Sequence, residues 1–171
     1  MRQAMPIAAM LLLLMCGCTE KAPDTTALVH YPLDSIDEIG AVENVSFDSV
    51  VSYDGQGSIK ITATDSTVVN LFNISDPDIE NTRLLYRARI KSENVIGQAY
   101  LEMWCAFPGK GEYFTRDLLT PITGSRDWME EEVAFVLEKG QKPSSIRLNV
   151  VFEGSGIVWI DDIRLLTSAL K

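Results

Sequence analysis

The sequence predicts an all-β domain in which two antiparallel sheets pack face to face. Two observations lead to this prediction. Apolar and polar residues alternate along most of the chain, which is typical of strands that bury only one face. Clusters of Gly, Pro, Asp and Ser interrupt the alternation at short intervals, as turns between strands do. Because no long stretch has helical periodicity, we expect the apolar faces of the strands to pack as a two-sheet sandwich.

The first half of the chain carries the weaker part of this pattern. Strands are expected here at residues 28–32, 43–48, 58–64 and 67–74. Between the first two, Leu33, Ile36 and Ile39 have helical spacing, but the segment is long enough only for a short helix. The sequence Asp54-Gly55-Gln56-Gly57 predicts a turn before the third strand.

The alternation is clearest in the second half. Strands are expected at residues 84–91, 99–107, 132–137, 146–153 and 156–166. The stretch from Trp128 to Leu137 contains consecutive Glu residues that suit a helix, but its β-branched and aromatic residues favour a strand. Residues 108–117 are rich in Gly and are interpreted as a loop, in which Tyr113 and Phe114 are placed to border a binding face.

The first residues have the features of a targeting signal. Arg2 is positively charged, and the apolar run that follows is shorter than the roughly 20 residues that span a bilayer. Gly17 precedes Cys18, which resembles the lipobox cut by lipoprotein signal peptidase. The resemblance implies a signal peptide at 1–17 and a lipid anchor on Cys18. The polar residues that follow predict a tether over 18–26, and the remaining residues, 27–171, are expected to form one domain. An ordinary secreted protein or a single-pass anchor is the alternative.

The anchor predicts a bacterial cell-envelope location. Thr19 is not the Asp that typically retains such proteins in the inner membrane, so the outer membrane is favoured. Once Cys18 is lipidated, Cys105 has no partner for an internal disulfide and is expected to be a small buried hydrophobic residue.

Composition excludes several classes of function. The net charge of −9 makes nucleic acid an unfavourable partner. The single histidine, His30, leaves little for a Ser-His pair or a histidine-rich zinc site. The sequence also contains no nucleophile elbow and no phosphate-binding glycine loop.

Two segments resemble a known family. The closing segment Gly156-Ile157-Val158-Trp159-Ile160-Asp161-Asp162 and the earlier Gly57-Ser58-Ile59-Lys60 are similar to jelly-roll sandwiches of the galactose-binding-like superfamily. Trp128 ahead of the strand at 132–137 is also similar. This superfamily includes carbohydrate-binding modules, and the resemblance implies a jelly roll over residues 28–167.

The same resemblance implies a structural calcium ion. Many members hold Ca²⁺ where the opening segment, the first glycine loop and the last strand meet. Calcium is bound by carboxylate and carbonyl oxygens, and the matching positions here are Asp34, Asp54 and Asp161. In the alternative interpretation, Asp161 bonds to loop amides and Asp54 builds a turn.

The polar side of the alternating strands predicts a binding face. If the strands share one sheet, planar polar groups and aromatic rings gather on its exposed side, as in sugar recognition. The candidate ligand-binding residues are Arg87, Arg89, Tyr100, Glu102, Trp104, Arg147, Asn149 and Glu153. In the alternative interpretation, the charged members are cross-strand ion pairs on a solvated sheet.

The favoured function is therefore a membrane-anchored, non-catalytic domain that binds an oligo- or polysaccharide. One alternative is a cell-envelope scaffold that binds another envelope protein and no sugar. A second is a glycosidase, which needs two carboxylates such as Glu102 and Glu153 across the scissile bond. Neither carboxylate stands out in so acidic a chain, so a binding role is favoured.

Overall fold

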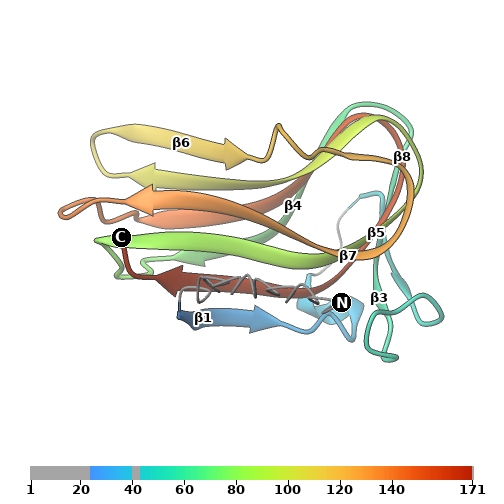
Figure 1. Ribbon diagram of the computed structural model, residues 1–171, viewed down its shortest axis with the longest axis horizontal. Coiled ribbons are helices and arrows are strands. Elements are labelled where there is room, and N and C mark those ends of the chain that lie inside the picture. Colours follow the sequence, from blue (N-terminus) through green and yellow to red (C-terminus); the bar gives the residue numbers. More distant parts are fainter. Residues whose placement is uncertain (1–23, 40–42, 171) are drawn as a thin grey trace, which may run out of the picture.

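The computed structural model describes residues 24–39 and 43–170, which form two packed layers of antiparallel strands (Figure 1). The elements are β1 (Thr25–Tyr31), the 3-10 turn η1 (Ile36–Glu38), β2 (Val45–Asp48), β3 (Ser58–Ala63), β4 (Thr67–Ser75), β5 (Thr82–Phe107), β6 (Gly111–Arg116), β7 (Ile122–Leu137) and β8 (Ser145–Ser168). The all-β sandwich predicted from the alternation is confirmed. The predicted signal peptide, Cys18 and most of the tether lie outside the described residues.

Two long strands run through both layers. The first half of β5 pairs with the second half of β8. On its other side this part of β5 pairs with β7, and this part of β8 pairs with β1 and β3. We call this sheet the first layer. The second half of β5 and the first half of β8 pair with β6 and β4, and they form the second layer. Figure 1 shows the long strands bending from one layer into the other.

This continuity differs from the sequence prediction, which divided each long strand in two. Residues 84–91 and 99–107 both belong to β5, and residues 146–153 and 156–166 both belong to β8. The glycines that suggested a break at 154–156 instead allow a bend. Pairing between the two strands shifts register there but continues on both sides.

The bend depends on two glycines that face each other. Gly97 of β5 is the register partner of Gly154 of β8, and both have a positive φ, of 83° and 142°. A Cβ atom on Gly97 would collide with the carbonyl oxygen of Glu153, and one on Gly154 with that of Ile96. The two backbones can therefore approach this closely only without side chains at these positions.

The core lies between the two layers and contains the apolar set of each strand. The inward residues Ala99, Leu101, Met103 and Cys105 of β5 are at most 3% exposed. Cys105 is buried and free, as the sequence predicted. The predicted short helix is realised only as the single turn η1, and residues 128–137 are part of strand β7.

We predict that Gly154→Ala destabilises the fold more than Gly124→Ala does. Both residues have a positive φ, which costs an alanine about 1–2 kcal/mol. Only at Gly154 does the new methyl group also meet backbone atoms, since nothing lies within 4 Å of a Cβ built on Gly124. The free energy of unfolding in urea should fall by about 1 kcal/mol or more beyond the control. Equal losses would show that the bend tolerates a side chain.

Candidate functional site

The bend in β5 divides the eight predicted binding residues between two surfaces. Arg87 and Arg89 precede the bend and lie on the outer side of the first layer, opposite Glu132 and Glu130 of β7. They form ion pairs there, with N–O distances of 2.6 Å from Arg87 to Glu132 and 3.0 Å from Arg89 to Glu130. These two arginines therefore form cross-strand ion pairs and lie away from the other six residues. The strands form one continuous sheet, but its bend places these two arginines on a different surface.

The other six residues share the outer side of the second layer. Register places Trp104 opposite Arg147, and Glu102 opposite Asn149. On the other side of β5, β6 adds Phe114 opposite Trp104 and Arg116 opposite Glu102. We call this surface the polar–aromatic face. Its members are Tyr100, Glu102, Trp104, Phe114, Arg116, Arg147, Asn149 and Glu153.

Glu102 is the centre of the hydrogen bonding on this face. Its carboxylate accepts a bond of 2.6 Å from Trp104 Nε1 and one of 2.8 Å from Asn149 Nδ2. Arg116 Nε donates to the other oxygen at 2.6 Å. Glu102 is only 1% exposed although it lies on the outer side of a sheet. A carboxylate withdrawn from water needs such donors, and here they fix the positions of an indole, an amide and a guanidinium group.

Aromatic rings and guanidinium groups alternate around this centre. The Trp104 and Phe114 rings lie 4.8 Å apart, centroid to centroid, and Phe114 is 52% exposed. Arg147 lies over the Trp104 ring at 5.4 Å, and Arg116 lies over the Phe114 ring at 5.3 Å. Arginines stacked in this way hold the rings in place, and Phe114 is exposed whereas Trp104 is half-buried.

Polar groups extend the face toward the β4 edge of the sheet and toward the bend. On the β4 side, Asn70 donates to Asn149 at 2.9 Å, and Asn73 donates to Asn70 at 2.7 Å. Near the bend, Glu153 of β8 accepts a bond of 2.8 Å from Arg116 of β6, and its side chain is 52% exposed. The face therefore has a buried hydrogen-bonded centre and accessible polar groups at its margins.

Arg116 was not among the predicted binding residues, and Phe114 was expected only to border the face from a loop. The glycines and the proline in residues 108–117 suggested a loop, whereas residues 111–116 form the edge strand β6. The alternation of Glu112, Phe114 and Arg116 with Tyr113 and Thr115 is the signal that identifies this strand.

Two of the three aspartates proposed for calcium accept hydrogen bonds from backbone amides. Asp161 is 1% exposed, and its two oxygens accept bonds from the backbone N–H groups of Tyr53 at 3.0 Å and Asp162 at 2.8 Å. Asp54 accepts a bond from Gln56 N at 2.9 Å within its own turn. Asp34 lies half-buried between β1 and η1. Within residues 24–39 and 43–170, no group of three or more His, Cys, Asp or Glu side chains could hold a metal.

These hydrogen bonds are those of the alternative interpretation of Asp161 and Asp54. Asp161 ties the loop before β3 to the last strand, and Asp54 closes a turn. Burial, with a smaller contribution from the charges of Asp54 and Asp162, raises the pKa of Asp161 from 3.8 to about 6.

We predict that this raised pKa makes Asp161 a source of stability at low pH. The folded protein holds the proton more tightly than the unfolded chain, so the contribution is complete below about pH 4 and is lost as the pH rises through about 6. The melting temperature of the wild type, measured relative to Asp161→Asn, should therefore fall between these pH values. A bound calcium ion would lower this pKa and remove the fall. A difference between wild type and variant that is constant with pH would contradict the prediction.

We also predict that Glu102→Gln destabilises the protein much more than Glu153→Gln. Both carboxylates bond to Arg116, but their side chains are 2% and 52% exposed. Loss of the buried charge should cost about 1.5–3 kcal/mol, and loss of the exposed one about 0–1 kcal/mol. Urea unfolding of the two variants measures both values, and similar losses would mean that Glu102 does not organise the face.

Comparisons of the sequence with protein-family models and with curated proteins found no match. Comparison of the structure did find similar folds. The family 22 xylan-binding domain from Paenibacillus barcinonensis has a TM-score of 0.61 and 14% identity, covering 88% of this chain and 99% of that domain. A family 16 carbohydrate-binding module has a TM-score of 0.53 and 14% identity, covering 71% of this chain and 84% of that one.

A third similar structure contains a bound ligand. It comprises N-terminal modules of an endo-1,4-β-D-xylanase from Clostridium thermocellum complexed with xylohexaose. Its TM-score is 0.59 at 11% identity, covering 85% of this chain and 29% of that one. These likenesses establish that the chain has the jelly-roll fold of carbohydrate-binding modules, as the sequence resemblance predicted.

Proposed function

We propose that this protein is a non-catalytic domain that binds an oligo- or polysaccharide on the polar–aromatic face. The observation that carries the proposal is the pair of rings formed by Trp104 and Phe114, held between arginines on the outer side of a sheet. A pyranose ring presents C–H groups on its faces and hydroxyl groups around its rim. The rings of this surface suit the C–H faces of the sugar. The accessible groups of Glu153, Arg147 and Asn73 suit its hydroxyl groups.

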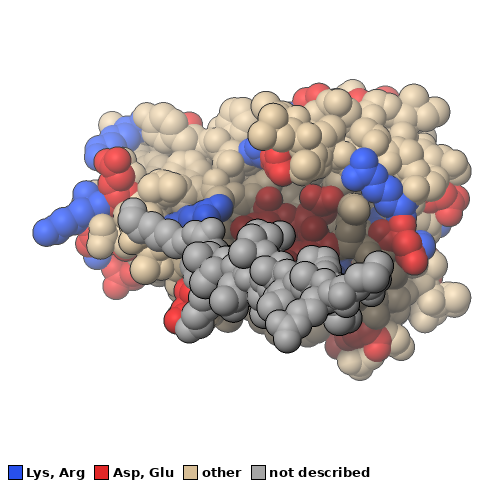
Figure 2. Space-filling view, in the orientation of Figure 1, with Lys and Arg blue, Asp and Glu red and all other residues tan. Residues whose placement is uncertain are grey.

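The charge of the molecule favours a neutral sugar. The chain has a net charge of −9, and Figure 2 shows acidic side chains gathered in a hollow near the middle of that view. Asp117, Glu131 and Glu132 line small clefts between the end of β6 and β7. An anionic polysaccharide would be repelled by this distribution, whereas a neutral one would not.

The arrangement of Glu102 and Glu153 supports binding without catalysis. Glu102 is buried and accepts three hydrogen bonds, so its carboxylate is withdrawn from any ligand on the face. Glu153 is accessible, but its carboxylate is paired with the same Arg116. A pair of glycosidase carboxylates must instead both reach the scissile bond.

The lipobox-like sequence supports a location for this binding domain. A lipid anchor on Cys18 would hold it at the bacterial cell envelope, with the outer membrane favoured by Thr19. In the part of the chain that the structure describes, no helix is long and apolar enough to cross a membrane. The scaffold function, in which an envelope protein occupies the same face, is the second candidate, since the exposed Phe114 would also suit a protein partner.

We predict that Trp104→Ala weakens sugar binding about tenfold or more, because it removes the ring that the other groups surround. The full-length protein is tested on an array of neutral oligosaccharides that includes xylohexaose, and affinities for the hits are measured by calorimetry. Tyr53→Ala is the matched control, since Tyr53 is a 46% exposed ring over Arg89 on the opposite layer. A blank array, or equal losses in the two variants, would contradict the proposal.

A further inference from the structure

A cleft of about 450 Å³ opens between β6 and β7, outside the polar–aromatic face. In the described part of the chain these two strands pair only with β5, so the two layers are not joined by hydrogen bonds along this side. Phe107, Lys110, Tyr113, Phe135, Glu138 and Gln141 are among the lining residues, and we call this space the edge cleft. Its volume lies within the range of about 300–1,000 Å³ that is typical of small-molecule sites.

One wall of the edge cleft is aromatic. Register places Tyr113 opposite Cys105 and Phe135 opposite Leu84, so both rings turn toward the space between the layers. Phe107 lines the cleft and is 9% exposed, with its ring centroid 6.0 Å from that of Tyr113 and 6.1 Å from that of Phe135. Tyr113 remains 53% exposed, and its hydroxyl donates to the carbonyl oxygen of Lys110 at 3.1 Å.

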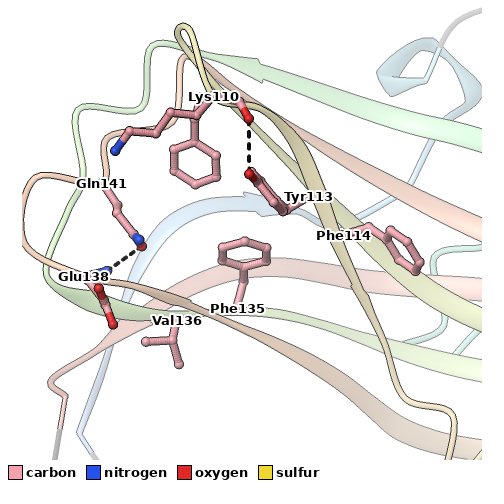
Figure 3. A pocket seen from close by; sticks show the side chains of 8 residues that line it. Lys110, Tyr113, Phe114, Phe135, Val136, Glu138 and Gln141 are labelled. Carbon is pink, nitrogen blue, oxygen red and sulfur yellow. Dashed lines mark hydrogen bonds between the residues drawn. The ribbon is translucent and has the colours of Figure 1, made fainter.

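The opposite wall is polar, as Figure 3 shows for Lys110, Gln141 and Glu138. The side-chain oxygen of Gln141 accepts a bond of 2.9 Å from the backbone N–H of Glu138. Within the described residues, the ammonium group of Lys110, the carboxylate of Glu138 and the amide N–H groups of Gln141 have no protein partner. The cleft thus presents a cation, an anion and an amide donor that are free to bind a ligand.

Aromatic rings beside a cation, an anion and an amide favour one class of ligand over others. A purely apolar ligand would offer no partner to the exposed charges of Lys110 and Glu138. A strongly anionic or cationic ligand would be attracted by one of these two groups and repelled by the other. A neutral polyhydroxylated ring can stack its C–H face on Tyr113 or Phe135 while its hydroxyl groups bond to both charges and to the amide.

We propose that the edge cleft is a second sugar site, which takes a neutral mono- or disaccharide unit independently of the polar–aromatic face. This inference rests on the proposed carbohydrate-binding function and extends it. Phe114 lies next to both sites, because it belongs to the face and also borders the cleft across the width of β6. A single glycan chain can therefore occupy the face and the cleft together, with a gain in overall affinity over either site.

The test is an NMR titration of the full-length protein with cellobiose, xylobiose, lactose and maltose at millimolar concentration. With at least one of these sugars, backbone amides of residues 107–113 and 135–141 should shift, both in the wild type and in Trp104→Ala. Tyr113→Ala should weaken this response about tenfold. Tyr113→Phe is the matched control, since it keeps the ring and removes only the hydroxyl, and it should bind like the wild type. Because Tyr113 is largely exposed, neither change should unfold the protein.

The outcomes separate this inference from the proposed function. Shifts confined to residues 100–104 and 147–153 would support binding on the face and overturn the second site. Shifts confined to the cleft would support the second site and count against the face. No response to any of the four sugars at residues 107–113 and 135–141, or an unchanged response in Tyr113→Ala, would overturn the edge cleft as a sugar site.

Discussion

The candidate binding face depends on one buried carboxylate. Glu102 lies on the outer side of a sheet, where a charged side chain is ordinarily solvated, yet three donors surround it and only 1% of it is exposed. A buried charge is tolerated only with such partners, so the side chains of Trp104, Asn149 and Arg116 are held where the carboxylate requires them. Arg116 in turn packs against the ring of Phe114. The central carboxylate therefore gives the face a fixed shape before any ligand arrives, and preorganisation of this kind lowers the entropic cost of binding.

The bend in the long strands decides which residues can belong to that face. Because β5 and β8 pass from one layer to the other, residues on the same strand lie on opposite outer surfaces of the sandwich. The close approach of Gly97 and Gly154 makes this passage possible. The same bend leaves β6 and β7 as edges of different layers, and the edge cleft is the space between them. One backbone feature thus creates both the face and the cleft.

Much of the fold, and part of the site, follows from the sequence. Period-two alternation identifies the core side of β5 and β8, since Leu101 and Leu148 are buried as expected. Six of the eight predicted residues share one surface for the same reason. The pattern cannot show that a strand continues through a bend, so Arg87 and Arg89 were assigned to a surface that they do not reach. The glycines of residues 108–117 also concealed strand β6 and the contribution of Arg116, although Phe114 was expected to border the face. The edge cleft depends on residues brought together from separate hairpins, so no local sequence pattern predicts it.

The central claim is that a sugar ring binds against the Trp104–Phe114 pair while Glu102 remains a buried support. A crystal structure of the full-length protein with its best oligosaccharide from the array tests this claim most directly. We expect a pyranose ring in contact with Trp104 or Phe114, hydroxyl groups bonded to residues at the margin of the face, and Glu102 still bonded to Trp104, Asn149 and Arg116. A sugar bound only elsewhere on the molecule, or one that contacts the Glu102 carboxylate directly after displacing these donors, would contradict it.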